Sequence, residues 1–346
     1  MSKLVLFNEL DRENYLNKRA GESKFGEHIS YLNQITNIYD DLKNLDVQYV
    51  IFGIPEDLGV FANLGNHGTA GAWHACLKAL LNIQSNQFTL AKNVLILGYL
   101  DFSSYTAKLA NFDKNNPKDL QKSRKLVAKI DNHVAELVTQ IVAAGKTPIV
   151  IGGGHNNAYG NIKGTSLALK KPLNVINFDA HTDLRAEEGR HSGNGFSYAY
   201  SEGFLKNYFI FGLHENYTSK AIFKQLDTNS NFQYNTFEAI EIRKDLKFKS
   251  EIKRALLFMQ GKPYGIEIDC DAIQNMPSSA KSPSGFSSNK TRHFVHKVSQ
   301  SKHAMYLHLC EAAPTPETDT QVGKMLAYLI TDFIKGHYAA RVGATY

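Results

Sequence analysis

Residues 173–183 read Leu-Asn-Val-Ile-Asn-Phe-Asp-Ala-His-Thr-Asp, a mostly apolar run followed at once by three side chains that bind metals. The apolar part is typical of a buried parallel strand. An extended backbone points alternate side chains the same way, so Asp179, His181 and Asp183 are expected to converge beyond the strand. Helix capping explains one aspartate there, but not three potential ligands. The segment predicts a metal site at the carboxyl edge of a sheet.

The rest of the chain repeats this alternation of apolar strand and amphipathic helix. The clearest helical pattern runs from Gln121 to Ala144, with apolar residues at steps of three and four. Polar loops are expected at 113–119 and 277–289, within one domain. The pattern predicts a doubly wound α/β sheet with helices on both faces, whose ligands bind at the carboxyl ends of the strands. The other predicted strands are 47–54, 94–98, 148–151, 208–213, 264–268 and 305–309.

Composition limits the class of protein. The chain has 346 residues, 43% hydrophobic and 21% charged, which fits one large packed domain. Its net charge of +6 is spread along the whole length, which argues against nucleic-acid binding and permits attraction of an anionic small substrate. The three cysteines form no CxxC pair, and no apolar run reaches the length of a membrane span. We therefore expect a cytoplasmic protein with reduced thiols.

Two more strand ends carry potential ligands. Three glycines precede His155 and let the backbone turn sharply, although such a histidine alone is more often a helix cap or packed turn residue. Asp269 and Asp271 follow the apolar run 264–268. Two carboxylates that close together need a cation or raised pKa values. Cys270, between them, is expected to point away and pack in the core.

Together these strand ends offer two imidazoles and four carboxylates. One tetrahedral zinc ion needs fewer ligands, and the oxygen-rich set suits two neighbouring ions of higher coordination number, such as manganese. A metal pair lowers the pKa of a shared water and polarises the group that the water attacks. The predicted reaction class is metal-assisted hydrolysis.

At these positions the chain resembles the arginase, agmatinase and formiminoglutamase family, the ureohydrolases, whose motifs are Gly-Gly-x-His, Asp-Ala-His-x-Asp and Asp-x-Asp. The resemblance covers roughly residues 47–334. It implies a three-layer α/β/α sandwich around an eight-stranded, mostly parallel sheet, formed by residues 1–346 with 1–45 as an N-terminal extension packed on it. It also implies two Mn²⁺ per chain and a homo-oligomer. The implied ligands are His155 and Asp183 for one ion, His181 and Asp271 for the other, and Asp179 and Asp269 as bridges.

A fourth strand end supplies a candidate for substrate binding. Glu311-Ala312-Ala313-Pro314 follows the run 305–309 and is similar to the family's Glu-x-x-Pro, whose glutamate holds the guanidinium or amidine. A carboxylate suits this role because it accepts two parallel hydrogen bonds from a planar cation. The alternative is an ordinary solvated glutamate before a loop.

The choice of substrate is expected to depend on residues beyond the ligands. Arg185 stands where arginases usually have Asn, and a guanidinium there favours an anionic tail. The segment 190–196 resembles the Ser-Gly-Thr-Pro-Phe of formiminoglutamases, with Ser192 in place of an agmatinase histidine. Arg190 is a second candidate for carboxylate binding and His191 a candidate proton shuttle; a solvated arginine and a loop histidine without a catalytic role are the alternatives. These features predict a formimidoylglutamase, an enzyme of histidine degradation that releases formamide and glutamate.

Three other interpretations remain open. One is an arginase, agmatinase or guanidino-acid hydrolase that releases urea. Another is an arginase-fold deacylase with one zinc ion, which would leave His155 and Asp271 without a role. The third is a catalytically silent ligand-binding homologue, suggested by Gly154 and Gln274 where the family usually has Asp. The segment 277–289 is expected either to cover the pocket as a lid or to be a surface loop.

Overall fold

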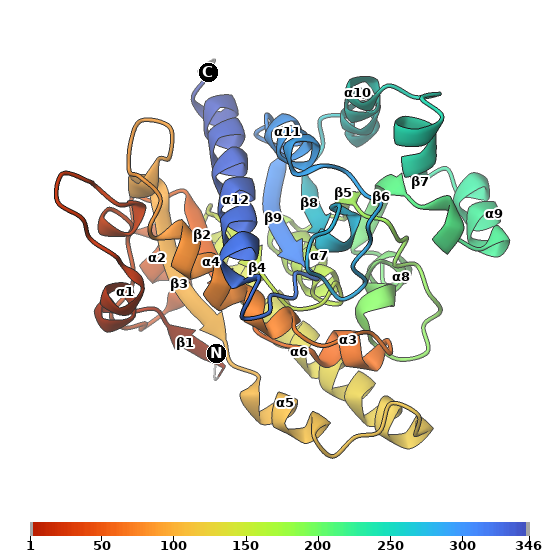
Figure 1. Cartoon of the computed structure of the whole chain (residues 1–346), viewed down its shortest axis with the longest axis horizontal. Helices are drawn as coiled ribbons and strands as arrows, with labels where there is room; N and C mark the ends of the chain where they lie inside the picture. The colour runs from red at the N-terminus through yellow and green to blue at the C-terminus, as the bar shows by residue number, and fades with distance from the viewer. Residues whose placement is uncertain (1–2, 344–346) are drawn as a thin grey trace.

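The computed structural model describes residues 3–343 and has three layers, with one sheet between two layers of helices (Figure 1). The sheet has nine strands in the order β1-β3-β2-β4-β9-β8-β5-β6-β7. Every pairing is parallel except that of β1 with β3. The strands are β1 (Leu4–Leu6), β2 (Tyr49–Gly53), β3 (Val94–Leu100), β4 (Thr147–Ile151), β5 (Leu173–Phe178), β6 (Leu205–Leu213), β7 (Phe232–Thr236), β8 (Tyr264–Asp269) and β9 (Ala304–Cys310).

All seven predicted strands are present, and the predicted fold class is confirmed with one strand more than the expected eight. The two strands that were not predicted lie at the edges of the sheet. β1 has three residues, too few to show a period, and it pairs antiparallel with β3. β7 is only partly buried and contains Gln and Asn, so it lacks the apolar run of a central strand. The N-terminal segment therefore adds a strand to the sheet as well as packing against it.

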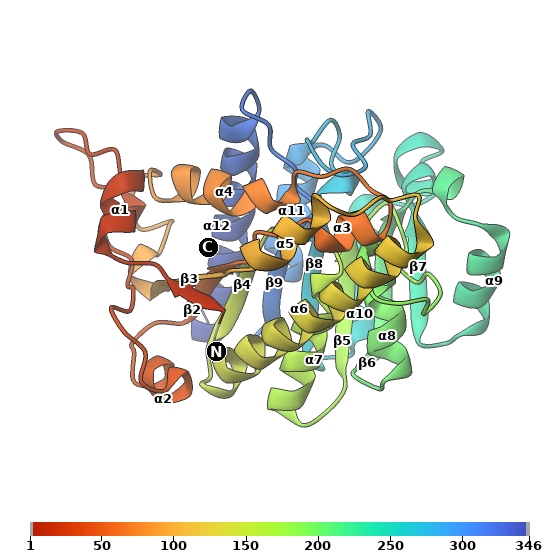
Figure 2. The same cartoon turned by 90° about the horizontal axis from the view of Figure 1, so that it is seen from below.

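Helices cover both faces of the sheet (Figure 2). Val50 and Phe52 of β2 belong to the core under α6, whereas Ile51 belongs to the core under α4 and α12. This alternation is the pleat of a strand buried on both sides. On the first face lie α2 (Ile38–Lys43), α3 (Leu58–Ala62), α6 (Pro117–Ala143), α7 (Asn157–Leu169) and α8 (Gly195–Ser201). On the second face lie α4 (Ala72–Leu80), α10 (Phe248–Met259), α11 (Ser288–Val298) and α12 (Asp319–Val342). The remaining helices are α1 (Glu9–Tyr15), α5 (Ser103–Leu109) and α9 (Lys220–Thr228).

The predicted helix of residues 121–144 is α6, but it begins four residues earlier, at Pro117. The Asn116 side chain accepts a hydrogen bond from the Lys118 backbone N–H, and Pro117 occupies the first turn, where its missing N–H costs nothing. The predicted loop 113–119 is therefore shorter than expected.

The fold places four strand ends side by side. β4, β9, β8 and β5 are consecutive in the middle of the sheet, although β4 and β5 are consecutive in the chain and β8 and β9 come much later. The carboxyl ends of parallel strands meet at one edge, and ligands bind there in open α/β sheets. The four segments that carry the predicted site residues follow these four strands.

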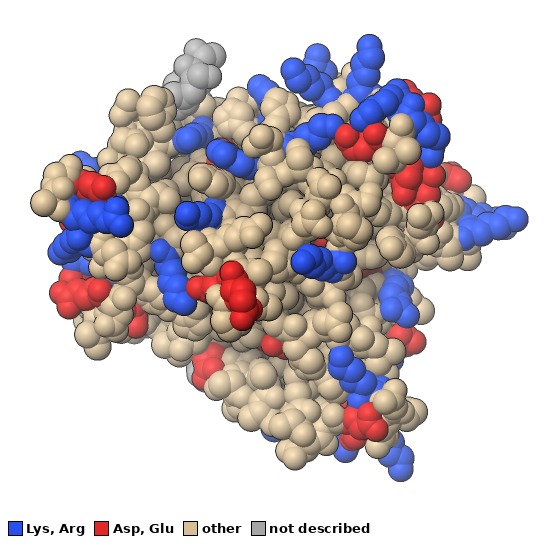
Figure 3. All heavy atoms as spheres, viewed as in Figure 1, with Lys and Arg blue, Asp and Glu red and all other residues tan. Residues whose placement is uncertain are grey.

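Two general properties follow from the surface and the helices. Lysine and arginine are interspersed with aspartate and glutamate on the face shown in Figure 3, so that face has no extended patch of one charge. Within residues 3–343, no helix combines the length and the apolarity needed to cross a membrane.

Candidate metal centre and substrate pocket

Four predicted ligands meet around the imidazole of His155. Its Nδ1 lies 2.9 Å from Asp183 Oδ2, 3.1 Å from Asp269 Oδ2 and 3.2 Å from Asp179 Oδ2. His155 and Asp179 are fully buried, and the four side chains form one group able to hold a metal ion. The ends of β4, β5 and β8 thus converge as the sequence predicts.

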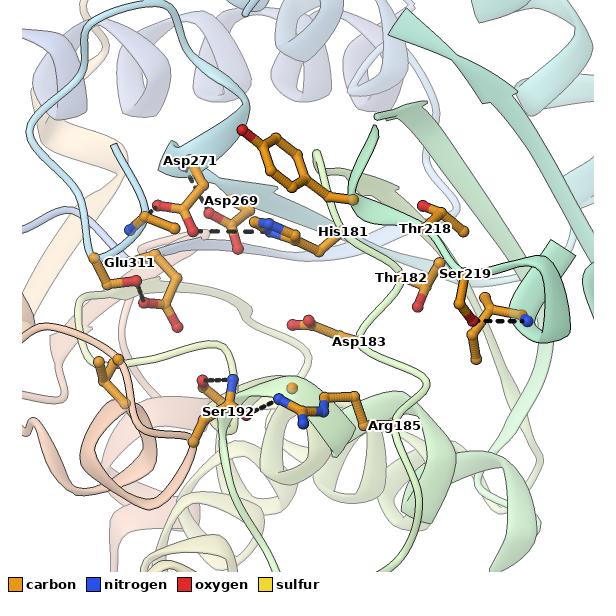
Figure 4. A pocket seen from close by; sticks show the side chains of 18 of the residues that line it. His181, Thr182, Asp183, Arg185, Ser192, Thr218, Ser219, Asp269, Asp271 and Glu311 are labelled. Atoms are coloured by element: carbon orange, nitrogen blue, oxygen red, sulfur yellow. Dashed lines mark hydrogen bonds and ion pairs between the residues drawn. The ribbon is translucent and has the colours of Figure 1, made fainter. Parts of the chain in front are cut away.

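The other two predicted ligands lie beside this group. His181 Nδ1 is 3.6 Å from Asp179 Oδ1 and 3.9 Å from Asp271 Oδ2. Asp179 therefore reaches both imidazoles, through a different oxygen for each. Figure 4 shows Asp269, Asp271 and His181 close together on one side of the pocket, with Asp183 nearer its middle.

The backbone that brings the ligands together is turned, and the predicted extended geometry is wrong. Asp179 Oδ1 accepts a hydrogen bond from the His181 backbone N–H at 2.7 Å, and Asp269 Oδ1 accepts one from the Asp271 N–H at 2.7 Å. A carboxylate that captures an N–H two residues ahead folds the chain into a tight turn. Asp183 has a φ of 48°, in the left-handed region. The side chains after β5 and β8 converge because each of these two strands ends in such a turn.

Crowding of buried charge shifts the pKa values of the cluster. Burial and the neighbouring charge of Asp271 raise the pKa of Asp269 well above its usual range. Burial and the charge of Asp179 also raise the pKa of Asp183. Although burial opposes it, the Asp179 carboxylate raises the pKa of His181 to about 10. The protein's own groups therefore supply too little positive charge to balance the four carboxylates, three of which are buried.

The cluster has the properties of a site for cations. His155 Nδ1 is buried and has no hydrogen-bond partner, although three carboxylate oxygens surround it. Buried polar atoms are normally paired, and buried carboxylates are paired or coordinate metals. Two imidazoles and four carboxylates on one edge are the donor set of two adjacent divalent ions. The residues present therefore fit the metal pair that the sequence implies.

Glu56, which sequence reasoning missed, supports the loop that carries His155. Its buried carboxylate accepts hydrogen bonds from the Gly154 backbone N–H at 3.1 Å and from the amides of Asn156 at 3.2 Å and Asn157 at 2.8 Å. Burial raises its pKa. The available signal was a glutamate directly after the apolar run of β2, the same signal that marked the other strand ends.

Gly154 has no room for a side chain. A Cβ there would lie 2.7 Å from Asn156 Oδ1, 2.9 Å from Val60 Cγ2 and 3.2 Å from Glu311 Oε1. An aspartate, which the family usually has at this position, does not fit this packing. Gln274, the other departure from the family pattern, is exposed, and its backbone pairs with Phe286.

A pocket of about 560 Å³ opens beside the metal cluster. His181, Asp183, Asp269 and Asp271 line it, together with Glu311. Burial and the charge of Asp271 raise the pKa of Glu311 to about 8. Figure 4 shows the Glu311 carboxylate within the pocket, across from Asp183. The predicted substrate-binding glutamate is thus placed beside the ligands.

Arg185 and Ser192 lie together on another side of the same pocket (Figure 4). Arg185 Nη1 donates to Asn63 Oδ1 at 2.8 Å, and Asn63 Nδ2 donates to Ser192 Oγ at 3.0 Å. A Cβ at Gly193 would lie 2.8 Å from Arg185 Cδ, so the missing side chain there makes room for the arginine. Of the pocket-lining residues in the described chain, Arg185 alone carries a fixed positive charge. Asn63 had no signal in the sequence.

Arg190 does not reach the pocket, which corrects its predicted role in binding a substrate carboxylate. Its buried guanidinium donates to Asp131 Oδ2 at 2.8 Å and to the Asn156 carbonyl at 2.9 Å. It also lies over the rings of Tyr159 and Tyr198. The side chain links α6 to the segment after β4 and has no free donor pair for a ligand.

His191 is also placed outside the residues that line the pocket, and the proton-shuttle prediction is not supported. Its side chain is fully buried, and its Nδ1 accepts a hydrogen bond from the Gly193 backbone N–H at 3.1 Å. Burial and the charge of Arg124 lower its pKa to about 3. A neutral imidazole that caps a turn is a structural element of this loop.

The segment 277–289 forms part of the pocket wall through Ser279 and Ala280. The Ser279 hydroxyl donates to Glu311 Oε2, and the Ala280 N–H donates to Asp271 Oδ1 at 3.1 Å. On the other side, Asn66 donates to the Ser279 carbonyl at 3.1 Å. The segment therefore contacts both the cluster of predicted metal ligands and Glu311, the predicted substrate-binding glutamate.

The chain is similar in sequence and in fold to known proteins. A family model described as "Arginase family" matches residues 47–335. A formimidoylglutamase of Streptococcus gordonii is 26% identical over 89% of this chain and 89% of its own length. The crystal structure of a Bacillus subtilis formimidoylglutamase superposes with a TM-score of 0.73 at 18% identity, over 98% of this chain and 100% of that one. A Trypanosoma cruzi formiminoglutamase with Mn²⁺ gives a TM-score of 0.66 at 19% identity, over 91% of this chain and 98% of that one.

Proposed function

Because the chain belongs to the arginase family, we propose that it hydrolyses a C–N bond of a linear amidine and that its substrate is N-formimino-L-glutamate. The products are L-glutamate and formamide, as in histidine degradation. One observation carries this proposal: the cluster of six potential metal ligands adjoins a single pocket that also holds Glu311, a carboxylate suited to a planar cation, and Arg185, a guanidinium suited to an anionic tail.

The six ligands are proposed to hold two Mn²⁺ ions. His155 and Asp183 would hold one ion and His181 and Asp271 the other, while Asp179 and Asp269 would serve both. The contacts of Asp179 with both imidazoles support its role as a bridge. The Mn²⁺ in the Trypanosoma cruzi formiminoglutamase structure supports the choice of metal. When bound, a pair of divalent ions lowers the pKa of water, so that water attacks at neutral pH.

Glu311 orients the reacting end of the substrate. The bound cationic amidine favours the ionised form of Glu311. The carboxylate then accepts hydrogen bonds from the amidinium and places the formimino carbon against the ligand cluster. Water adds its oxygen to this carbon, the bond from the carbon to the glutamate nitrogen breaks, and both protons of the water pass to that nitrogen, which leaves as the ammonium group of glutamate while the carbon is released as formamide. Ser279 and the His155 backbone N–H hold the carboxylate in place from two sides.

Arg185 recognises the other end of the substrate. A guanidinium pairs with a carboxylate in a bidentate manner and repels a cationic tail such as that of agmatine. Asn63 takes one donor of Arg185 and fixes the side chain, and its amide also binds Ser192. The order of charges along the pocket, negative at Glu311 and positive at Arg185, matches a molecule with a cationic amidine and an anionic tail.

The proposal is tested by product identity. The protein loaded with Mn²⁺ is incubated separately with N-formimino-L-glutamate, arginine, agmatine and a guanidino acid, and formamide and urea are measured. We expect formamide from formimino-glutamate at the highest kcat/KM, and no product from an Asp271→Asn variant in parallel. Faster release of urea from any guanidine substrate would overturn the substrate assignment. If the loaded protein hydrolysed none of them, the hydrolase proposal itself would be wrong and a ligand-binding homologue would be favoured.

A further inference from the structure

A row of buried polar side chains crosses the sheet directly behind the metal cluster. Asn177 of β5 is opposite Glu267 of β8, and Glu267 is opposite His308 of β9. All three side chains are fully buried. The core of a parallel sheet is normally apolar, so a glutamate in this position requires partners.

Glu267 has two hydrogen-bond partners and one further polar neighbour. Its Oε1 accepts a hydrogen bond from the Tyr306 hydroxyl at 2.7 Å, and its Oε2 lies 2.5 Å from His308 Nδ1. The same Oε2 is 3.5 Å from Nε2 of His155. Glu267 therefore faces the ring nitrogen of His155 opposite to the one that the ligand carboxylates surround.

We propose that Glu267 positions the imidazole of His155 for metal binding, and that Tyr306 and His308 hold Glu267 in place for this task. An imidazole that donates its Nε2–H to a carboxylate keeps the lone pair of Nδ1 free for a cation and has a fixed ring orientation. This inference rests on the proposed function only in requiring that the metal pair binds.

The geometry favours this role over a purely structural one. A carboxylate placed only to satisfy His308 and Tyr306 would not need to reach His155, which comes from a different strand end. Nδ1 and Nε2 of His155 both lack hydrogen-bond partners, and Glu267 is the acidic side chain that Nε2 faces in the described part of the chain. The imidazole is thus enclosed by acidic oxygen atoms on both edges.

The test measures Mn²⁺ binding in place of turnover. The electron paramagnetic resonance signal of free Mn²⁺ is followed during titration of the wild type, Glu267→Gln, Tyr306→Phe and His155→Asn. Glu267→Gln retains the shape of the side chain and removes its charge. We expect the wild type to bind two ions per chain. In Glu267→Gln the dissociation constant of one ion should rise roughly 10- to 100-fold, the range typical of groups that orient ligands. Tyr306→Phe should weaken the same ion to a smaller extent.

A double variant identifies which ion is affected. If Glu267 acts through His155, then Glu267→Gln adds no further weakening in a His155→Asn background. Glu251→Gln is the matched control, because Glu251 is a buried carboxylate bonded to Asn235 and Arg254 away from the cluster. Glu251→Gln should leave both Mn²⁺ dissociation constants unchanged. Thermal unfolding in EDTA is compared for all variants, so that a general loss of stability is recognised.

Unchanged Mn²⁺ dissociation constants in Glu267→Gln would overturn the positioning role. Equally weakened binding of both ions, in proportion to a loss of thermal stability in EDTA, would overturn it as well. Those outcomes leave the proposed function intact, since the wild type still binds two ions. A wild type that binds no Mn²⁺ would contradict both proposals.

Discussion

Glu311 accepts a hydrogen bond from the backbone N–H of His155, with 2.6 Å between Oε1 and the nitrogen. In a second hydrogen bond, the Glu311 backbone N–H donates to the Gly153 carbonyl at 3.0 Å. Glu311 adopts a left-handed φ of 59° in this arrangement. The proposed amidine-binding carboxylate is therefore fixed by the backbone to the loop that carries His155, a proposed metal ligand.

Replacement of Glu311 by Gln should separate substrate binding from metal binding. The amide has the same shape but carries no charge, so the charge-assisted hydrogen bonds to the amidinium are lost. A loss of about 1.5–3 kcal/mol corresponds to a roughly 10- to 100-fold fall in kcat/KM. Steady-state kinetics with formimino-glutamate measure this, while Mn²⁺ titration should still give two ions. An unchanged kcat/KM would show that Glu311 does not bind the amidinium.

Replacement of Asn63 by Ala should weaken binding of the substrate tail. Arg185 loses the acceptor that orients it, and Ser192 loses its donor. We expect KM for formimino-glutamate to rise about tenfold, for the loss of one hydrogen bond to a charged group, with kcat little changed. Arg185→Gln should raise KM further. Arg124→Gln serves as control, because Arg124 binds Glu188 and does not line the pocket. A fall in kcat at constant KM would contradict a role in tail recognition.

The sequence predicted the central elements because their signal is local. Each of the seven predicted strands is an apolar run, four of these runs are followed by the ionisable side chains of the predicted site, and parallel strands bring such ends together. β1 and β7 could not be found in this way, since an edge strand is short or half exposed and needs no apolar run.

Single loop residues were predicted less well, because the direction of a side chain depends on tertiary packing. Arg190 and His191 are close to Arg185 in sequence, yet they turn inward, toward Asp131 and the Gly193 N–H. Asn63 belongs to the site through folding alone. An asparagine is not unusual where it stands, so no pattern in one sequence marks it.

The stability of the fold should fall in mild acid because of His337. This side chain of α12 is buried, stacks on Phe333, and has Nδ1 3.2 Å from the Tyr49 hydroxyl. Burial and the charge of Arg341 lower its pKa from the usual 6.5 to about 4. The folded state thus favours the neutral ring, and this stabilisation is present above pH 6.5 and lost as the pH falls toward 4. The difference amounts to about 3 kcal/mol.

Urea unfolding in EDTA between pH 7.5 and 4.5 measures this effect. The difference in unfolding free energy between wild type and His337→Gln should shrink as the pH falls, since only the wild type loses the stabilisation of the neutral ring. His67→Gln, at an exposed histidine, should show no such trend. A difference that is constant with pH would show that His337 does not titrate in this range.

Gly154 should tolerate no larger residue while Asn156 keeps its place. The Cβ of Gly154→Ala would lie 2.7 Å from Asn156 Oδ1 and 2.9 Å from Val60 Cγ2, in a loop that Glu56 and Glu311 hold from both sides. Overpacking of this kind costs about 1–3 kcal/mol, and the aspartate that the family usually has there should cost more. Because Asn156 is the nearest obstacle, the same substitution in an Asn156→Ala background should cost less, and the two changes should be non-additive. Chemical denaturation of the four proteins in EDTA gives the coupling free energy. Additive costs would mean that the loop moves as a whole to admit a side chain. In that case the Gly154 Cα is not tightly confined, and packing does not explain why this chain has glycine where the family usually has aspartate.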